Sequence, residues 1–190
     1  PPTPPQPGQA PWSNWAAFKQ VLKQTFQRLD QTADVLEPGQ TPQRVGGGRF
    51  GRIEFENSGG GAVTLKVAAG QQGGWFPAFK EVYLWETFTL TLKLKVVNVG
   101  GGVALRPRTT LHGGRLYGRG WNLPSTQGNV VTLKMDVYKD KAALSSGGNP
   151  SELQLPANGN PPAGIPVLWL ANGARVEIHG VSVELKSKKK

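Results

Sequence analysis

The chain of 190 residues is long enough for one domain with a hydrophobic core, and its 26 glycines and 16 prolines favour turns over long helices. It contains no cysteine, which excludes disulfides and thiolate metal sites, and no apolar run long enough to span a membrane. The net charge of +10 predicts an anionic partner, such as nucleic acid, an acidic glycan or an acidic protein surface.

The first 48 residues predict an extension ahead of the domain. Residues 1–12 are rich in proline and predict an extended arm that lacks a secretory signal. Residues 13–37 predict one amphipathic helix, and residues 38–48 predict a linker of glycine and proline. The apolar face of the helix predicts an assembly interface or, alternatively, a face that packs on the protein's own sheet. Its side chains are Trp15, Phe18, Leu22, Phe26 and Leu29.

Residues 49–185 predict an all-β domain. Apolar and polar residues alternate with a period of two in many short segments, most clearly over residues 88–96, and glycine-rich turns separate the segments. This pattern predicts an antiparallel β-sandwich, a jelly roll of about eight strands. The final strand changes phase after Ile178, which predicts a bulge at Gly180. Residues 186–190 predict a solvated basic tail.

The residues do not form a catalytic constellation. His112 and His179 are far apart and lack a neighbouring acid cluster, and Glu54 and Glu56 alternate outward on one strand. The glycines do not follow a phosphate-binding pattern. We therefore predict a protein that is not an enzyme, with no metal and no cofactor.

A basic and aromatic stretch in the domain predicts a binding surface. No acidic residue occurs between Glu86 and Asp136, whereas Lys93, Lys95, Arg106, Arg108, Arg115, Arg119 and Lys134 supply positive charge. Planar guanidinium donors beside aromatic rings suit glycans or anionic groups. The residues expected to bind are Arg115, Tyr117, Arg119 and Trp121. The alternative is that Tyr117 and Trp121 plug one end of the sandwich.

A second aromatic pair, Trp75 and Phe76, stands in the loop-like sequence "GGWFPAF". The pair predicts a stacking platform for a ligand or a plug into a partner, and the alternative is a lid on the core.

Three segments together resemble the galactose-binding-like jelly rolls, especially carbohydrate-binding modules of families four and nine. They are "IEFENSGGGAVTLKVAAGQQGGW", "YLWETFTLTLKLKVVNVGGGVAL" and "ANGARVEIHGVSVEL". The resemblance covers residues 50–185 and implies the fold more than an activity. In the last segment Glu177, His179 and Gly180 stand where the family usually has Asp and Asn, so a calcium or ligand role of those acids does not carry over.

The order of arm, helix, linker and cysteine-free sandwich resembles phage virion proteins such as fibre, spike or decoration subunits. This resemblance implies a structural or adhesion subunit of the virion, a homo-oligomer whose partners are the other subunits. The alternative is an extracellular carbohydrate-binding module with a glycan as its partner. Nucleic acid ranks below both partners, because no nucleic-acid reader motif accompanies the basic residues.

Overall fold

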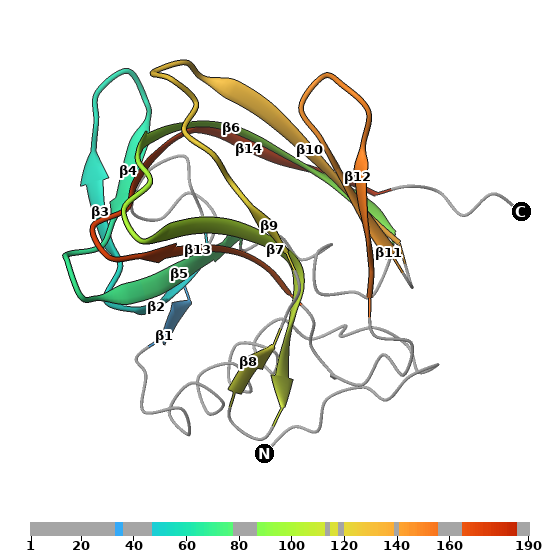
Figure 1. The fold of residues 1–190 in the computed structure, drawn as a ribbon, viewed down its shortest axis with the longest axis horizontal. Helices are drawn as coiled ribbons and strands as arrows, with labels where there is room; N and C mark the ends of the chain where they lie inside the picture. The colour runs from blue at the N-terminus through green and yellow to red at the C-terminus, as the bar shows by residue number, and fades with distance from the viewer. Residues whose placement is uncertain are drawn as a thin grey trace, which may run out of the picture.

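The computed structural model describes residues 33–35, 47–77, 87–112, 115–117, 120–138, 141–155 and 165–185. In this part of the chain the strands form two antiparallel sheets, which stack as a β-sandwich of the jelly-roll type (Figure 1). The predicted fold class is confirmed. Within the described residues, no helix is present that is long and apolar enough to cross a membrane.

The two sheets, named A and B here, alternate along the chain. Sheet A has the strand order β1-β2-β5-β13-β7-β8, with β9 also paired to β7. Its strands are β1 (Ala33–Val35), β2 (Gly47–Gly51), β5 (Gln72–Pro77), β7 (Gly102–His112), β8 (Arg115–Tyr117), β9 (Trp121–Asn122) and β13 (Ile165–Ala171). Sheet B has the order β12-β11-β10-β6-β14-β4-β3. Its strands are β3 (Glu54–Asn57), β4 (Val63–Lys66), β6 (Phe88–Asn98), β10 (Val131–Val137), β11 (Lys141–Ser145), β12 (Ser151–Gln154) and β14 (Arg175–Leu185).

The described part of the chain contains more strands than the eight or so predicted. The additional strands include the two residues of β9 and the three residues each of β1 and β8. Such short pairings with a longer neighbour are too brief to show a period of two in the sequence.

The long strand β6 forms the centre of sheet B, between β10 and β14. Every second side chain of β6 is buried against sheet A, which confirms the predicted alternation. The buried side chains are Phe88, Leu90, Leu92, Leu94 and Val96. Together with Leu133, Met135 and Val137 of β10 they belong to one hydrophobic core.

The predicted bulge in the last strand is confirmed. The pairing of β14 with β6 shifts register between Ile178 and Gly180, so that Ile178 lies opposite Leu94 and Gly180 opposite Lys93. The extra residue moves the following valines back onto the core face, where Val181 lies opposite Leu92. The bulge therefore explains how one strand can change phase and still bury apolar residues along its whole length.

The start of sheet A differs from the predicted boundaries. Gly47 and Gly48 belong to β2, which pairs with β5, so the predicted linker boundary between residues 48 and 49 falls inside a strand. Ala33–Val35, predicted as the end of the helix, form β1 and pair with β2. At the edge of the sheet their backbone groups form hydrogen bonds with β2. This pairing determines their structure more strongly than the helical spacing of the apolar residues in the sequence. The remaining residues of the predicted arm, helix and linker lie outside the described residues.

Two contacts show which face of sheet A points toward sheet B. A row across the sheet contains Arg49, Trp75, Leu168, Leu105 and Trp121 on five neighbouring strands. At one end of the row, the guanidinium of Arg49 lies 5.2 Å from the ring centroid of Phe55 in sheet B. At the other end, Nε1 of Trp121 donates a hydrogen bond of 3.2 Å to Oγ of Ser151, also in sheet B. This row therefore faces the interior, and the rows on either side of it face outward.

The alternation of β6 gives a direct test of the core. We expect Leu92→Ala to lower the free energy of unfolding by about 2–5 kcal/mol, because it removes a buried side chain and leaves a cavity. Lys93→Ala, the next position on the exposed face, should change it by less than about 0.5 kcal/mol. Urea denaturation followed by circular dichroism measures both. Equal effects of the two substitutions would contradict the assignment of the core face.

Candidate functional site

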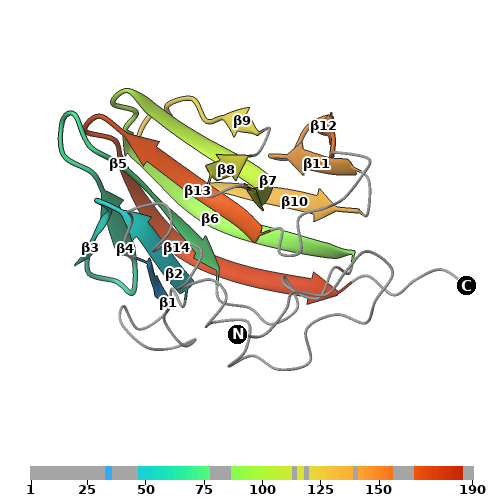
Figure 2. The same cartoon turned by 90° about the horizontal axis from the view of Figure 1, so that it is seen from below.

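The outer face of sheet A carries an aromatic side chain that the sequence analysis did not select. Trp169 of β13 lies in an outward row with Phe50, Gly74, Ala104 and Asn122. Its side chain is half-buried, whereas its neighbours Leu168 and Leu170 are buried in the core. Figure 2 looks onto this side of sheet A, with β13 and β5 toward the viewer.

The indole of Trp169 lies against the sheet surface, because a glycine leaves room for it. A Cβ atom at Gly102 would stand 2.9 Å from Cζ3 of Trp169, closer than such atoms approach. On β7 the guanidinium of Arg106 lies 5.7 Å from the centroid of the Trp169 ring. This cation–π contact places the guanidinium beside the indole. Gly102 and Arg106 thus define the surroundings of Trp169 on the outside of the sheet, with the ring edge toward Gly102.

The row of Trp169 also presents a polar group. Asn122 of β9 is exposed and lies two strands away, at a lateral distance of about 10 Å. Between the two stands the small side chain of Ala104. The site therefore combines an aromatic platform, a guanidinium and an amide. That composition suits a ligand with an apolar face and hydroxyl groups at its edge.

The predicted platform of Trp75 and Phe76 is wrong. The pair belongs to strand β5 and not to a loop, and the exposed fractions of the two side chains are 1% and 0%. Trp75 faces the interior, where its Nε1 has no hydrogen-bond partner among the described residues. Apolar packing alone holds this indole, so the pair corresponds to the core alternative of the sequence analysis.

Trp121 takes the structural role that the sequence analysis offered as its alternative. Its half-buried ring faces sheet B, and its hydrogen bond to Ser151 joins β9 of one sheet to β12 of the other. The ring closes the edge of the sandwich. Its tethered position between the sheets does not resemble an exposed ligand platform.

Two other members of the predicted surface, Arg115 and Tyr117, pair with a different part of β7 from Trp121. Arg115 and Tyr117 lie on β8, which pairs with β7 at Thr110–His112, whereas Trp121 pairs with Leu105. The offset of five residues along β7, from Leu105 to Thr110, separates the two pairings by about 16 Å. Figure 1 shows β8 at the lower end of β7, where this strand bends away from sheet B. The side chains of Arg115 and Tyr117, and all of Arg119, lie outside the described residues.

The predicted basic region is divided between the two faces of the sandwich. Lys93 and Lys95 are on the outer face of sheet B, and Arg106 is on the outer face of sheet A. Nζ of Lys95 lies 3.5 Å from Oε2 of Glu177, so an acid distant in sequence compensates this charge. The antiparallel pairing of β6 with β14 creates this ion pair, and a count of nearby acids along the chain could not reveal it.

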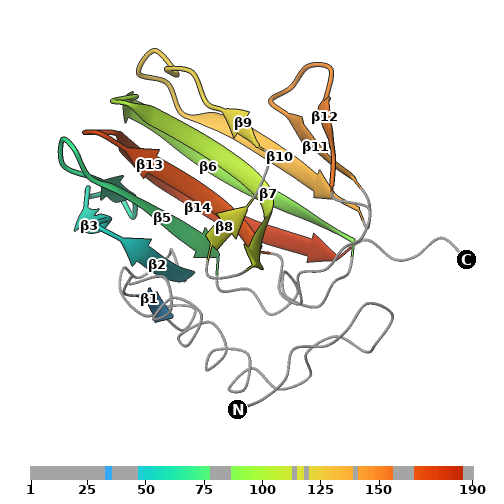
Figure 3. The same ribbon diagram turned by 60° about the horizontal axis from the view of Figure 1, so that its bottom comes forward.

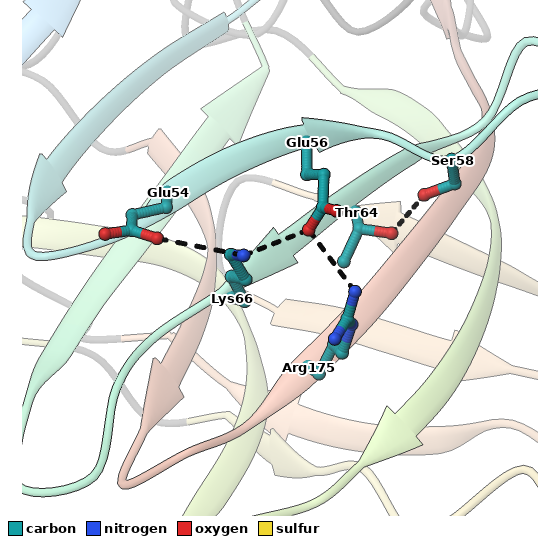
Figure 4. Close-up of polar contacts among 6 residues, drawn as sticks. All are labelled: Glu54, Glu56, Ser58, Thr64, Lys66 and Arg175. Carbon is teal, nitrogen blue, oxygen red and sulfur yellow. Dashed lines mark hydrogen bonds and ion pairs between the residues drawn. The ribbon is translucent and has the colours of Figure 1, made fainter.

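The outer face of sheet B contains a polar hollow of about 560 Å³ beside β3, β4 and β14. In its wall Glu56 accepts from Nζ of Lys66 at 3.0 Å and from Arg175 at 3.3 Å, as Figure 4 shows. Glu177 is bound by Lys95 and by Nε2 of His179, at 2.7 Å. The charged groups satisfy one another, which leaves little reason for a charged ligand to bind.

The hydrogen bond and the positive charge of Lys66, together with the charge of Arg175, hold the pKa of Glu56 below its ordinary value. Glu56 is thus an ionised partner in surface ion pairs and is unsuited to be a proton donor near neutral pH. Among the described residues, no three His, Cys, Asp or Glu side chains are grouped so as to hold a metal ion.

No protein-family model and no curated protein matches the chain. Several solved structures are similar. A family 7 alginate lyase, A1-II′, in complex with its substrate is 11% identical over 72% of this chain and 83% of that chain, with a TM-score of 0.43. A family 29 carbohydrate-binding module, CBM29-2, complexed with cellulohexaose is 15% identical over 81% of this chain and 90% of that chain, with a TM-score of 0.44.

The binding domain of Botulinum neurotoxin DC in complex with rat synaptotagmin II is also similar. It is 6% identical over 81% of this chain and 48% of that chain, with a TM-score of 0.47.

The position of Trp169 depends on Gly102. We expect Gly102→Ala to displace the indole, because the added methyl group would overlap the ring. In protein labelled with 5-fluorotryptophan, the resonance assigned through Trp169→Phe should shift in the ¹⁹F spectrum. Gly148→Ala is the control, since nothing lies within 4 Å of a Cβ at that position and its backbone does not have a positive φ. A Trp169 resonance that Gly102→Ala leaves in place would contradict the described packing.

The Glu56 ion pairs predict a pH dependence. Because the folded-state pKa of Glu56 is lowered, its contribution to stability is present above the unfolded-state pKa and is lost as the pH falls through the lowered value. A ¹³C NMR titration should place the carboxyl midpoint below that of an ordinary Glu. Lys66→Gln should raise the midpoint, whereas Lys134→Gln, remote from the pair, should not. An unchanged midpoint in Lys66→Gln would mean that Lys66 is not the main cause.

Proposed function

We propose that the protein is a non-catalytic carbohydrate-binding protein and that a sugar ring stacks on Trp169. The observation that carries the proposal is the half-buried Trp169 indole on the outer face of sheet A, with its ring edge against Gly102 and the Arg106 guanidinium beside it. One face of a pyranose ring presents C–H groups, which pack on an aromatic face, and its edge presents hydroxyl groups.

The polar groups near Trp169 suit the hydroxyl edge. The guanidinium of Arg106 is a planar donor, and the amide of Asn122 both donates and accepts. Asn122 is exposed and lies in the same row as Trp169, so one oligosaccharide lying across the strands could reach both side chains. The proposed ligand is therefore a glycan chain and not a single anionic group.

The assembly role stays a prediction. Residues 1–32 and the basic tail at 186–190 lie outside the described residues, and so do the five side chains of the predicted assembly interface. A position in a virion or outside the cell likewise remains a prediction from the sequence, and sugar binding is compatible with either.

The proposal is tested by calorimetric titration with cellulohexaose as a neutral glycan and an alginate oligosaccharide as an acidic one. Trp169→Ala should weaken binding by at least about tenfold, because it removes the stacking surface. Trp121→Phe is the matched control, since this tryptophan faces sheet B. If the neutral glycan is the ligand, the affinity should be almost independent of salt, whereas a contact of an acidic sugar with Arg106 should weaken as salt rises.

Binding that survives Trp169→Ala with the domain still folded would contradict the stacking site. Absence of binding to both glycans at millimolar concentration would count against the proposed function for these two sugar classes. If alginate binding is lost in Arg106→Gln but not in Trp169→Ala, the charge of Arg106 recognises the ligand and stacking on Trp169 does not.

A further inference from the structure

The outer face of sheet A contains buried apolar side chains that no described strand covers. On the same face as Trp169, two residues further along the strands, Gly48 of β2 pairs with Phe76 of β5, and Val167 of β13 pairs with Arg106 of β7. Phe76 and Val167 each adjoin the paired residues Trp75 and Leu168. The exposed fractions are 0% for Phe76 and 1% for Val167. The face toward sheet B belongs to the neighbouring row of Trp75, so packing between the two sheets does not account for this burial.

The neighbours of Phe76 on the sheet are too small to enclose it. Gly48 has no side chain, Val167 is short, and the outward position one row away on the same strand is Gly74. A phenyl ring on an open sheet face would keep one side in water. Another part of the same chain must therefore lie over this face.

The position of β1 indicates which part of the chain this is. Ala33–Val35 pair with β2 at the edge of sheet A, so the residues before Ala33 enter at the border of this face. Figure 3, in which the lower side of the molecule comes forward, shows β1 beside β2 at that border. Residues 13–32 carry the apolar spacing of an amphipathic helix, which needs a surface of this kind.

We propose that residues 13–32 form an amphipathic helix that packs on the outer face of sheet A over Phe76 and Val167, beside the row of Trp169 proposed to bind the glycan. Twenty helical residues span about 30 Å. The four strand spacings from β1 through β2, β5 and β13 to β7 amount to about 19 Å, so the segment is long enough to cross the face. Lys19 and Lys23 then lie on the solvent side of the helix.

The absence of cysteine from the chain permits a clean test on the full-length protein. The thiol introduced by Val167→Cys should react slowly with a maleimide while the helix covers it. Adding Phe18→Asp and Leu22→Asp should raise the rate by at least about tenfold, because the opened state becomes more populated. The matched control, Gln20→Asp with Gln24→Asp, places the same charges at the same spacing on the opposite side of the helix and should leave the rate unchanged.

Three results would overturn the proposal. A thiol that reacts freely without further substitution would show an uncovered face. The same slow rate in both double variants would assign the cover to residues 78–86 or 156–164, which adjoin β5 and β13. An equal increase in both would mean a general loss of structure, which circular dichroism would detect.

A disulfide cross-link tests the proposed helix position independently if the Phe18→Asp, Leu22→Asp variant does not fold. Mild oxidation of Val167→Cys combined with Leu22→Cys should form a disulfide within one chain, and Val167→Cys combined with Gln20→Cys should not. A disulfide between two chains would overturn the proposal in favour of docking on a second copy. Absence of any Leu22→Cys cross-link would overturn it as well.

Discussion

Burial of the central strands of sheet A on both faces is the constraint on which the rest of the structure depends. From Gly73 to Pro77 every residue of β5 is buried, and on β13 both Val167 and Leu168 are buried. Consecutive residues of a strand point to opposite faces, so sheet B can cover only half of these side chains. Packing against sheet B does not account for the burial of the other half, and in this respect sheet A differs from sheet B.

Sheet B meets water on its outer face, and its polar side chains are arranged accordingly. Glu177 contacts both Lys95 and His179, and Glu56 joins Lys66 to Arg175. Exposed ion pairs contribute little stability individually, but they leave few charges without a partner. On the outer face of sheet A, by contrast, the half-buried Trp169 lies beside the guanidinium of Arg106.

The sequence predicts strands well where only one face is buried. The strands β6 and β10 alternate clearly, and the change of phase in β14 correctly locates the bulge at Gly180. The strand β5 was predicted as a loop, because two glycines precede its aromatic pair and burial on both faces removes the alternation. Burial on both faces also hides Trp169 in an apolar run of the sequence. Because Trp169 alternates with Leu168 and Leu170, its position along the strand nevertheless indicated that it points to the opposite face of the sheet.

The predicted ligand surface depended on proximity along the chain, and pairing between distant strands decides otherwise. Trp121 follows Arg115 and Tyr117 closely in sequence, yet β9 and β8 pair with different parts of β7. The hydrogen bond that holds Trp121 goes to Ser151 of the other sheet, and the sequence does not indicate that these two residues are partners. Pairing between distant strands also explains why the basic residues lie on two different faces of the sandwich.

Two of the turns that carry the chain between the sheets pack against each other at one end of the sandwich. Gly100, with a φ of 56°, lies so close to the backbone of Asn172 and Ala174 that a side chain has no room, and Gly101 bonds to the carbonyl groups of Ala171 and Asn172. The turn between β6 and β7 and the turn between β13 and β14 are thus fastened to one another. We therefore expect amide protons near Val96 and Val176, beside these turns, to exchange with solvent more slowly than those near Phe88 and Leu185 at the other end of the same strands.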